Sequence, residues 1–245
     1  MPRYKCTVEY NGTGFSGWQK QKDAPTIQLC IEEALHAFCG QELTIYTAGR
    51  TDAGVHAIGQ VFHVDIEPAY PIERIQGALN FYLHGHAVAI LSVETVDATF
   101  HARFSAKKRH YQYHILNRRS PAVLDHLRMW HVPWALDAHA MQDAANHLLG
   151  THDFTSFRDT QCQAKSALKT LDTILVSRHE DRITVSVSAQ SFLHHMVRNI
   201  VGTLAMVGEG KYPPEYIQTI LAARDRKAAG PTAPAWGLYF MRVEY

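Results

Sequence analysis

One carboxylate lies in a loop where packing gives it no evident task. Asp52 stands two residues after Arg50, between Gly49 and Gly54, in a segment that joins two predicted strands. A carboxylate in such a loop is the type of group that acts as a nucleophile or as a general base. The same spacing also suits an Asx-turn, in which the side chain only bonds the backbone two residues further on. Arg50 suits either a phosphate contact or a simple ion pair.

Other side chains that can do chemistry lie on regular elements. Tyr111 alternates with Tyr113 along a predicted strand, a pattern that is also common in protein cores. Arg198 borders the apolar face of a predicted helix, where a guanidinium either pairs with a carboxylate or extends into solvent. His194 and His195 are neighbours, and adjacent residues of a helix point in different directions. We therefore predict no metal site.

A cationic stretch, residues 98–124, contains no Asp or Glu although the chain carries a net charge of only +1. Such a stretch either contacts phosphate or protects a solvated strand edge. It includes Arg103, three histidines and the cations that we consider as candidate phosphate contacts, namely Lys107, Lys108, Arg109, Arg118 and Arg119.

The elements that must position these groups follow the same order in both halves of the chain. Alternation and 3.6-residue periodicity predict strand, helix, strand, strand, helix, strand in the first half. The corresponding segments are 3–10, 27–38, 43–48, 60–66, a helix beginning after Pro71, and 87–96.

The second half repeats this architecture. Asp137 is predicted to cap its first helix, which Gly150 ends, and Ser191 is predicted to cap a later helix that continues to Leu204. The remaining segments are strands at 108–117, 170–178, 182–189 and 238–244 and a short helix around 217–221.

Each half therefore matches the split β-α-β-β-α-β unit. We predict an α+β fold whose N-terminal half spans residues 1–105 and whose C-terminal half spans residues 106–245. We expect antiparallel-rich sheets with helices on one side and a catalytic cleft between the halves, near the cationic stretch.

Composition excludes several classes of protein. A chain of 245 residues, 46% hydrophobic and 19% charged, is ordinary for a globular protein with its own core. Its four cysteines lie far apart without a C-x-x-C pair, which favours reduced thiols and a cytoplasmic location. We find no P-loop, no G-x-G-x-x-G motif, no signal peptide and no apolar run long enough for a membrane span.

The loop around Asp52 resembles a known signature. Residues 48–57, AGRTDAGVHA, are similar to the signature of the tRNA pseudouridine synthase A (TruA) family. The resemblance extends over nearly the whole chain. It includes Glu9–Gly12, Gly17–Gln19, Phe100–Ala106, Tyr111–Tyr113, Asp153–Arg158 and His194–Gly202.

The resemblance implies a pseudouridine synthase-like fold and an isomerase that converts uridine to pseudouridine at positions 38, 39 and 40 of the tRNA anticodon stem-loop. It implies that Asp52 is the catalytic carboxylate and that Arg198 forms an ion pair with it. Tyr111 would stack on a flipped base and relay a proton, while Arg50 and the candidate cations of the stretch would hold the tRNA. The family also implies a homodimer, and the internal rearrangement requires no cofactor.

Two other functions compete with this interpretation. A non-catalytic, RRM-like RNA-binding protein would share the architecture, but it would leave Asp52 without a role and would require exposed aromatics in an RNP pattern. A glycoside hydrolase would require two cooperating carboxylates, and only one is suggested.

One departure from the family concerns residues 80–86, NFYLHGH, where Asn-x-x-Leu-Pro is common.

Overall fold

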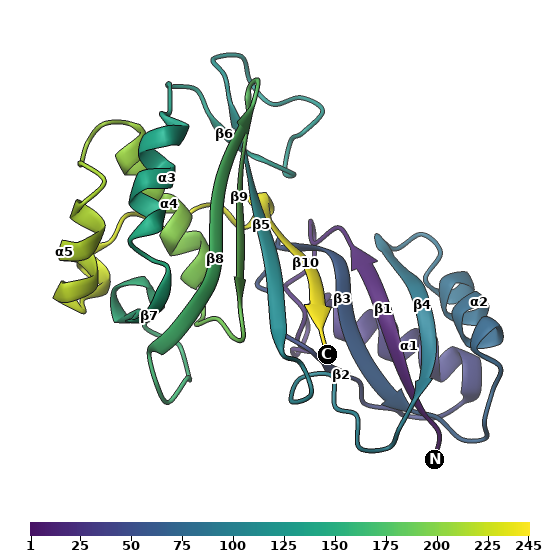
Figure 1. Cartoon of the computed structure of the whole chain (residues 1–245). Helices are drawn as coiled ribbons and strands as arrows, with labels where there is room; N and C mark the ends of the chain where they lie inside the picture. Colours follow the sequence, from purple (N-terminus) through teal and green to yellow (C-terminus); the bar gives the residue numbers. More distant parts are fainter. The chain divides into compact units, whose positions relative to one another are not determined.

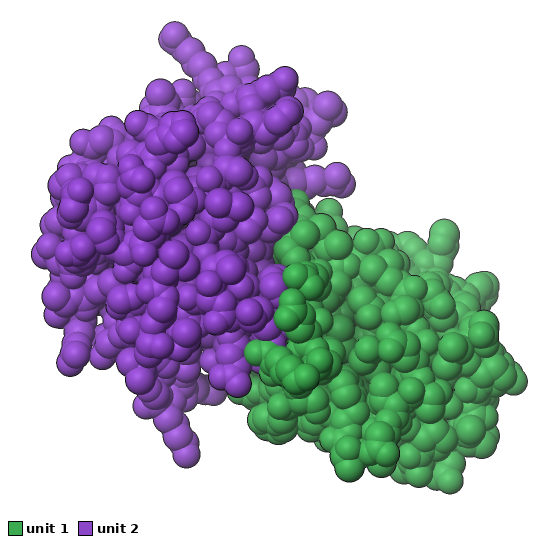
Figure 2. Space-filling model, viewed as in Figure 1, with its two compact units in different colours: residues 1–107, 239–245 green, residues 108–238 purple.

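The computed structural model describes the whole chain, residues 1–245, whose residues gather into two compact units (Figure 2). Unit 1 comprises Met1–Lys107 and Tyr239–Tyr245, and unit 2 comprises Lys108–Leu238. Each unit contains strands and helices of its own, so each is described by itself.

The final strand, β10 (Leu238–Glu244), distinguishes these units from the predicted halves. The sequence placed this strand in the half spanning 106–245. In the structure, Tyr239 and Phe240 pair in parallel with His56 and Ala57 of unit 1. A pairing between residues so distant in the chain leaves no local pattern from which it could be predicted.

Alternating hydrophobicity builds the sheet of unit 1. Along β1 (Arg3–Tyr10), Tyr4, Cys6 and Val8 are buried, and the side chains between them are more exposed. β1 pairs antiparallel with β4 on one side and with β3 on the other, and β3 also pairs with β2 and β10. The remaining strands are β2 (Tyr46–Thr47), β3 (His56–Asp65) and β4 (Val88–Val96).

Two helices cover the buried face of this sheet. α1 (Ile27–Cys39), predicted over 27–38, begins after Thr26, whose side chain accepts the Leu29 N–H, and is followed by Gly40 in the left-handed conformation. α2 (Ile72–Tyr82) packs against α1 and β4. The Tyr4 hydroxyl bonds the backbone of Tyr70 just before α2.

Unit 2 has an antiparallel sheet in the order β5–β9–β8–β7, and β6 pairs in parallel with β5. Figure 1 shows helices α3, α4 and α5 on one side of this sheet. Its strands are β5 (Lys108–Asn117), β6 (Trp130–Val132), β7 (Gly150–Asp153), β8 (Leu168–His179) and β9 (Arg182–Ala189).

The helices of unit 2 only partly follow their sequence signals. Asp137 caps α3 (Ala138–Asn146) as predicted, because its side chain accepts the N–H groups of His139 and Ala140. The helix ends before Gly150, which opens β7 instead. The other helices are α4 (Met196–Gly208), α5 (Tyr216–Ala223) and short 3-10 turns at Thr155–Phe157, Arg226–Ala228 and Ala235–Gly237.

The start of α4 corrects the predicted cap at Ser191. The helix begins only at Met196, because His195 adopts the left-handed conformation with φ 60° and precedes the first helical residue. Leu193 is buried, as its apolar character predicts, but it belongs to the turn before the helix. Hydrophobic periodicity alone does not distinguish a helical turn from a tight turn that buries the same residues.

The segment that departs from the family pattern forms a compact turn after α2. The N–H of His84 donates to Phe81 and the N–H of His86 donates to Leu83. Gly85 has φ 88°, a left-handed conformation that favours glycine. Asn80 is fixed by two hydrogen bonds with the backbone of Ile90, so the turn is well determined without a proline.

The predicted α+β class with antiparallel-rich pairing is confirmed by both units. None of the helices combines the length and hydrophobicity that crossing a bilayer requires.

Candidate active site

The Asp52 loop, residues 49–55, connects β2 to β3, and the supporting loop, residues 11–18, packs against it. Gly12 and Gly17 permit this contact. A Cβ atom on Gly12 would overlap the Val55 carbonyl, and one on Gly17 would lie 2.7 Å from the carbonyl oxygen of Thr51. Glycine is therefore required where the two backbones touch.

Hydrogen bonds fix the two loops together. The Trp18 N–H donates to the Thr51 carbonyl at 3.0 Å, and the Gly12 N–H donates to His56 Nδ1 at 3.0 Å. The hydroxyls of Tyr10 and Thr51 are bonded at 2.8 Å, and both side chains are buried. Buried hydrogen bonds therefore hold Thr51, which precedes Asp52, and His56, at the start of β3.

Two further elements complete this support. Buried Gln60 on β3 donates from Nε2 to the Gly49 carbonyl at 2.7 Å. The first N–H groups of α1, from Ile27 and Gln28, donate to the carbonyls of Gly17 and Trp18. Sequence reasoning missed Gln60 entirely, because a single amide within a strand gives no signal of its partner.

Asp52 itself is half-buried at the centre of this arrangement. Its backbone carbonyl accepts the Val55 N–H at 3.1 Å, which closes a turn around the carboxylate. Arg50 is exposed. A carboxylate that is only half-buried, on a backbone this constrained, can meet a ligand without a large rearrangement of the loop.

Tyr111 lies on β5 in unit 2, on a strand face that is otherwise buried. The side chains on the same face of the strand are buried, namely Arg109, Tyr113 and Ile115, whereas Tyr111 is half-buried. Its ring meets that of Phe192 edge to face, with centroids 5.0 Å apart. The Tyr111 side chain is therefore less buried than its neighbours on this face.

Arg198 lies in the first turn of α4 and is half-buried. Its Nε donates to the Ala233 carbonyl at 2.8 Å, and the Ala233 N–H donates to the Arg198 carbonyl at 3.1 Å. Burial raises the pKa of the neighbouring Tyr113 phenol, and the charge of Arg198 opposes that rise. Asp52 belongs to unit 1 and Arg198 to unit 2, so their ion pair stays a prediction.

The paired histidines interact with a carboxylate within unit 2. His195 Nδ1 lies 2.7 Å from one oxygen of Asp159, and His194 Nδ1 lies 3.6 Å from the other. Burial alone would raise the pKa of Asp159, but hydrogen bonds from the Gln161 N–H and from His195 outweigh it and lower that pKa. The pair therefore orders the turn that precedes α4.

Two cations of the cationic stretch form ion pairs with acidic residues from other segments of the chain. Lys108 forms an ion pair with Asp172 at 3.2 Å, and Arg118 forms one with Asp181 at 3.0 Å. These acids come from β8 and from the turn before β9, which local sequence could not reveal.

Arg109 is more buried than the other candidate phosphate contacts. Its side chain is buried, and Nη1 donates to the Gln190 carbonyl at 2.5 Å. We therefore assign it a structural role at the end of β9. Arg50, Lys107 and Arg119 remain exposed.

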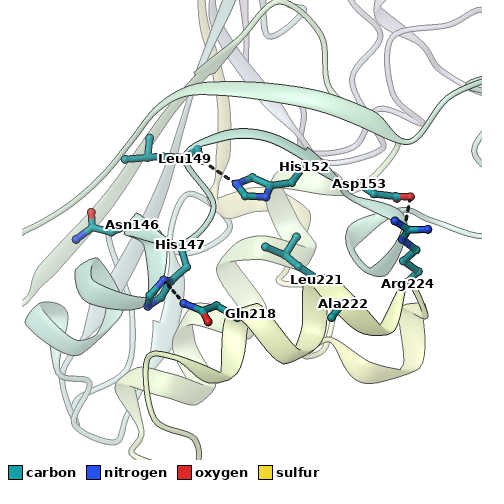
Figure 3. Close-up of a pocket in the computed structure, with 9 residues that line it drawn as sticks. All are labelled: Asn146, His147, Leu149, His152, Asp153, Gln218, Leu221, Ala222 and Arg224. Carbon is teal, nitrogen blue, oxygen red and sulfur yellow. Dashed lines mark hydrogen bonds and ion pairs between the residues drawn. The ribbon is translucent and has the colours of Figure 1, made fainter.

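A separate open cavity of about 810 Å³ lies in unit 2 between α3, β7 and α5 (Figure 3). Several polar side chains that line it form hydrogen bonds or ion pairs with other residues of the cavity. His147 bonds Gln218, and Asp153 pairs with Arg224. No predicted site residue lines this cavity, so we do not assign the reaction to it.

Comparison with known proteins decides the family. The model of the tRNA pseudouridine synthase family matches residues 7–105 and 144–245, which include Asp52 and Arg198. The chain belongs to this family. The predicted resemblance is thereby confirmed, and the chain is an isomerase.

Curated members of the family are similar over their whole length. A tRNA pseudouridine synthase A from Parvibaculum lavamentivorans is 53% identical over 245 residues, which cover all of both chains. Proteins of the same name from Paramagnetospirillum magneticum and Rhodospirillum centenum are 52% and 51% identical. The match covers all of this chain in both cases and 96% and 100% of the two relatives, respectively.

Proposed function

We propose that this synthase converts uridine to pseudouridine at positions 38, 39 and 40 of the tRNA anticodon stem-loop, with Asp52 as its catalytic carboxylate. The observation that carries this proposal is the Asp52 loop, whose neighbouring residues are held by buried hydrogen bonds while the carboxylate itself is only half-buried. Such a loop supplies one positioned reactive group, which is what an isomerisation within a single nucleoside requires.

The reaction is balanced without any external reagent. The N1–C1′ glycosidic bond breaks, the uracil turns, and C5 bonds to C1′; the proton on C5 is lost and N1 gains a proton. Nothing is oxidised or reduced, so the proposal requires no cofactor. Asp52 would either bond to C1′ or remove the proton from C2′.

Tyr111 and Arg198 are proposed to complete the site. A uridine turned out of its stack loses its neighbours, and the half-buried Tyr111 ring would replace them by stacking on the base. The Tyr111 hydroxyl would relay the C5 proton. Arg198 would keep Asp52 ionised, because a guanidinium favours the charged form of a nearby carboxylate.

Binding of the tRNA is proposed to depend on phosphate contacts. Arg50, Lys107 and Arg119 are exposed and are available to phosphate. Lys108 and Arg118 would first have to leave their ion pairs with Asp172 and Asp181. Contacts to the backbone suit an enzyme that acts at adjacent positions of different sequence.

We also propose a cytoplasmic homodimer, which rests on the family resemblance. Light scattering on the purified full chain tests the dimer and should give twice the mass of one chain.

The proposed activity is tested on an unmodified tRNA transcript by chemical mapping of pseudouridine. We expect modification at positions 38–40 wherever they carry uridine, and full activity after exhaustive treatment with EDTA. Pseudouridine only at other positions would contradict the site assignment. Loss of activity in EDTA that zinc restores would contradict a mechanism without a metal.

A further inference from the structure

An exposed aromatic cluster lies in unit 1 at the end of β3 that is remote from the Asp52 loop. It consists of Tyr46 on β2, His63 on β3, and His101 and Phe104 from the turn after β4. Tyr46 pairs with His63, which lies seven residues beyond His56. That spacing corresponds to roughly 23 Å along a strand. The cluster shares no residue with the support of Asp52, of which Gln60 is the nearest member along β3, three residues before His63.

The rings of this cluster contact one another in a row. Tyr46 stacks on His63 with centroids 5.2 Å apart, His63 meets His101 at 4.7 Å, and His101 meets Phe104 at 4.4 Å. Each ring is thus positioned by the one before it.

Backbone hydrogen bonds hold the two histidines and the turn in place. Nδ1 of His101 accepts the N–H groups of Arg103 and Phe104 at 3.1 and 3.4 Å. Nδ1 of His63 accepts the Ala102 N–H at 3.1 Å. The turn that carries Phe104 is therefore fixed to the sheet rather than loosely attached.

The outer members of the cluster are exposed to solvent. Phe104 is 77% exposed and Tyr46 is 51% exposed. The guanidinium of Arg103 lies 5.7 Å from the Phe104 ring centroid, and Lys107 is exposed three residues further on. Residues 98–107 contain no acid. Flat apolar rings beside positive charge are the combination that binds bases together with their phosphates.

We propose that this aromatic cluster is a second RNA contact, in which an unpaired base of the tRNA stacks on Phe104 and Tyr46 while Arg103 contacts the adjoining phosphate. Stacking on aromatic side chains tolerates any base, because every base has a π-face. The contact would therefore add affinity without selecting a sequence. The inference rests on the proposed tRNA substrate, but not on the role of Asp52.

Affinity measurements with the full chain test this contact. We expect Phe104→Ala to raise the Kd for a tRNA transcript about tenfold, the order of effect seen when one stacking partner is removed. It should weaken binding of a fluorescein-labelled uridine octamer as well, and it should raise KM for tRNA more than it lowers kcat. Phe104→Tyr should retain the affinity, whereas Phe104→Leu should lose it, because leucine is apolar but has no π-face.

Phe81→Ala is the matched control, since Phe81 is 73% exposed on α2 of the same unit. It should leave Kd and activity unchanged. Equal loss in Phe81→Ala, unchanged affinity in Phe104→Ala, or a change in oligomeric state instead of affinity would overturn the proposal. If the wild-type chain bound tRNA without forming pseudouridine, the proposed function would fail while this contact remained supported.

Discussion

At the scale of single residues, variants of two tyrosines on β5 should distinguish an effect on catalysis from an effect on stability. Tyr111→Phe keeps the ring and removes only the hydroxyl, so we expect slower chemistry in single turnover with an unchanged salt dependence of tRNA binding. Tyr113 is the matched control, because its buried hydroxyl donates to the Pro234 carbonyl at 2.7 Å. Tyr113→Phe should instead lower the free energy of unfolding by about 1–2 kcal/mol. Equal rates in Tyr111→Phe and wild type would remove the hydroxyl from the mechanism.

His63 gives the fold a pH dependence of known sign. Burial, and then the charge of Arg3, lower the pKa of His63 to about 4, below the value of ~6.5 for an unfolded chain. The unfolded state therefore binds more protons between these values, and stability falls as pH falls from about 6.5 to 4. Urea unfolding across this range should show that the unfolding free energy of His63→Gln falls by on the order of 3 kcal/mol less than that of wild type. As a control, His84→Gln at an exposed position should show the same change of unfolding free energy with pH as wild type. If both variants behave alike, His63 is not the titrating group.

The supporting loop is the element whose geometry the site depends on. A methyl group at Gly12 would overlap the Val55 carbonyl, so Gly12→Ala should push the two loops apart. We expect a loss of about 1–3 kcal/mol in unfolding free energy and a large fall in kcat. Gly77→Ala on α2 has open space around the new methyl and should stabilise the chain by about 0.5–1 kcal/mol with kcat unchanged. A fully active Gly12→Ala enzyme would show that the loop contact is dispensable.

Sequence patterns predict elements well where one local signal dominates. Strict alternation predicts β1 and β5 at their observed bounds, and the helix predicted over 27–38 corresponds to α1, which ends at Cys39. The start of α4 was missed because a left-handed His195 interrupts an apolar periodicity that continues through it. β2 is shorter than its hydrophobic run: the strand comprises Tyr46 and Thr47, which pair with His63 and Phe62 of β3.

At the scale of the whole molecule, the sequence did not predict which cations form ion pairs. Lys108 finds Asp172 and Arg118 finds Asp181, partners more than sixty residues away that only the folded sheet brings close. The family, by contrast, was predicted correctly, because the signature around Asp52 consists of residues adjacent in the chain. The support from Gln60 could not be predicted, since it depends on how β3 packs.

The salt dependence of tRNA affinity tests which cations of the enzyme contact tRNA phosphates. Each phosphate contact releases counterions, so Lys107→Ala should make the slope of log K against log salt shallower by roughly 0.7–0.9. Lys108→Ala should change it less, because Lys108 is already paired with Asp172. Lys22 is exposed in unit 1 and lies outside the stretch, so Lys22→Ala should leave the slope unchanged. An unchanged slope in Lys107→Ala would make the stretch a solvated edge.

The most direct measurement compares wild type and Asp52→Asn in single turnover, with enzyme in excess over an unmodified tRNA transcript. Asparagine keeps the size of the side chain and the backbone contacts of the loop but removes the charge. We expect circular dichroism to show a folded protein, Kd for tRNA to stay within a few-fold, and pseudouridine formation to fall by a factor of about 10²–10⁴ or more. Substantial pseudouridine formation by purified Asp52→Asn would contradict the catalytic role of Asp52.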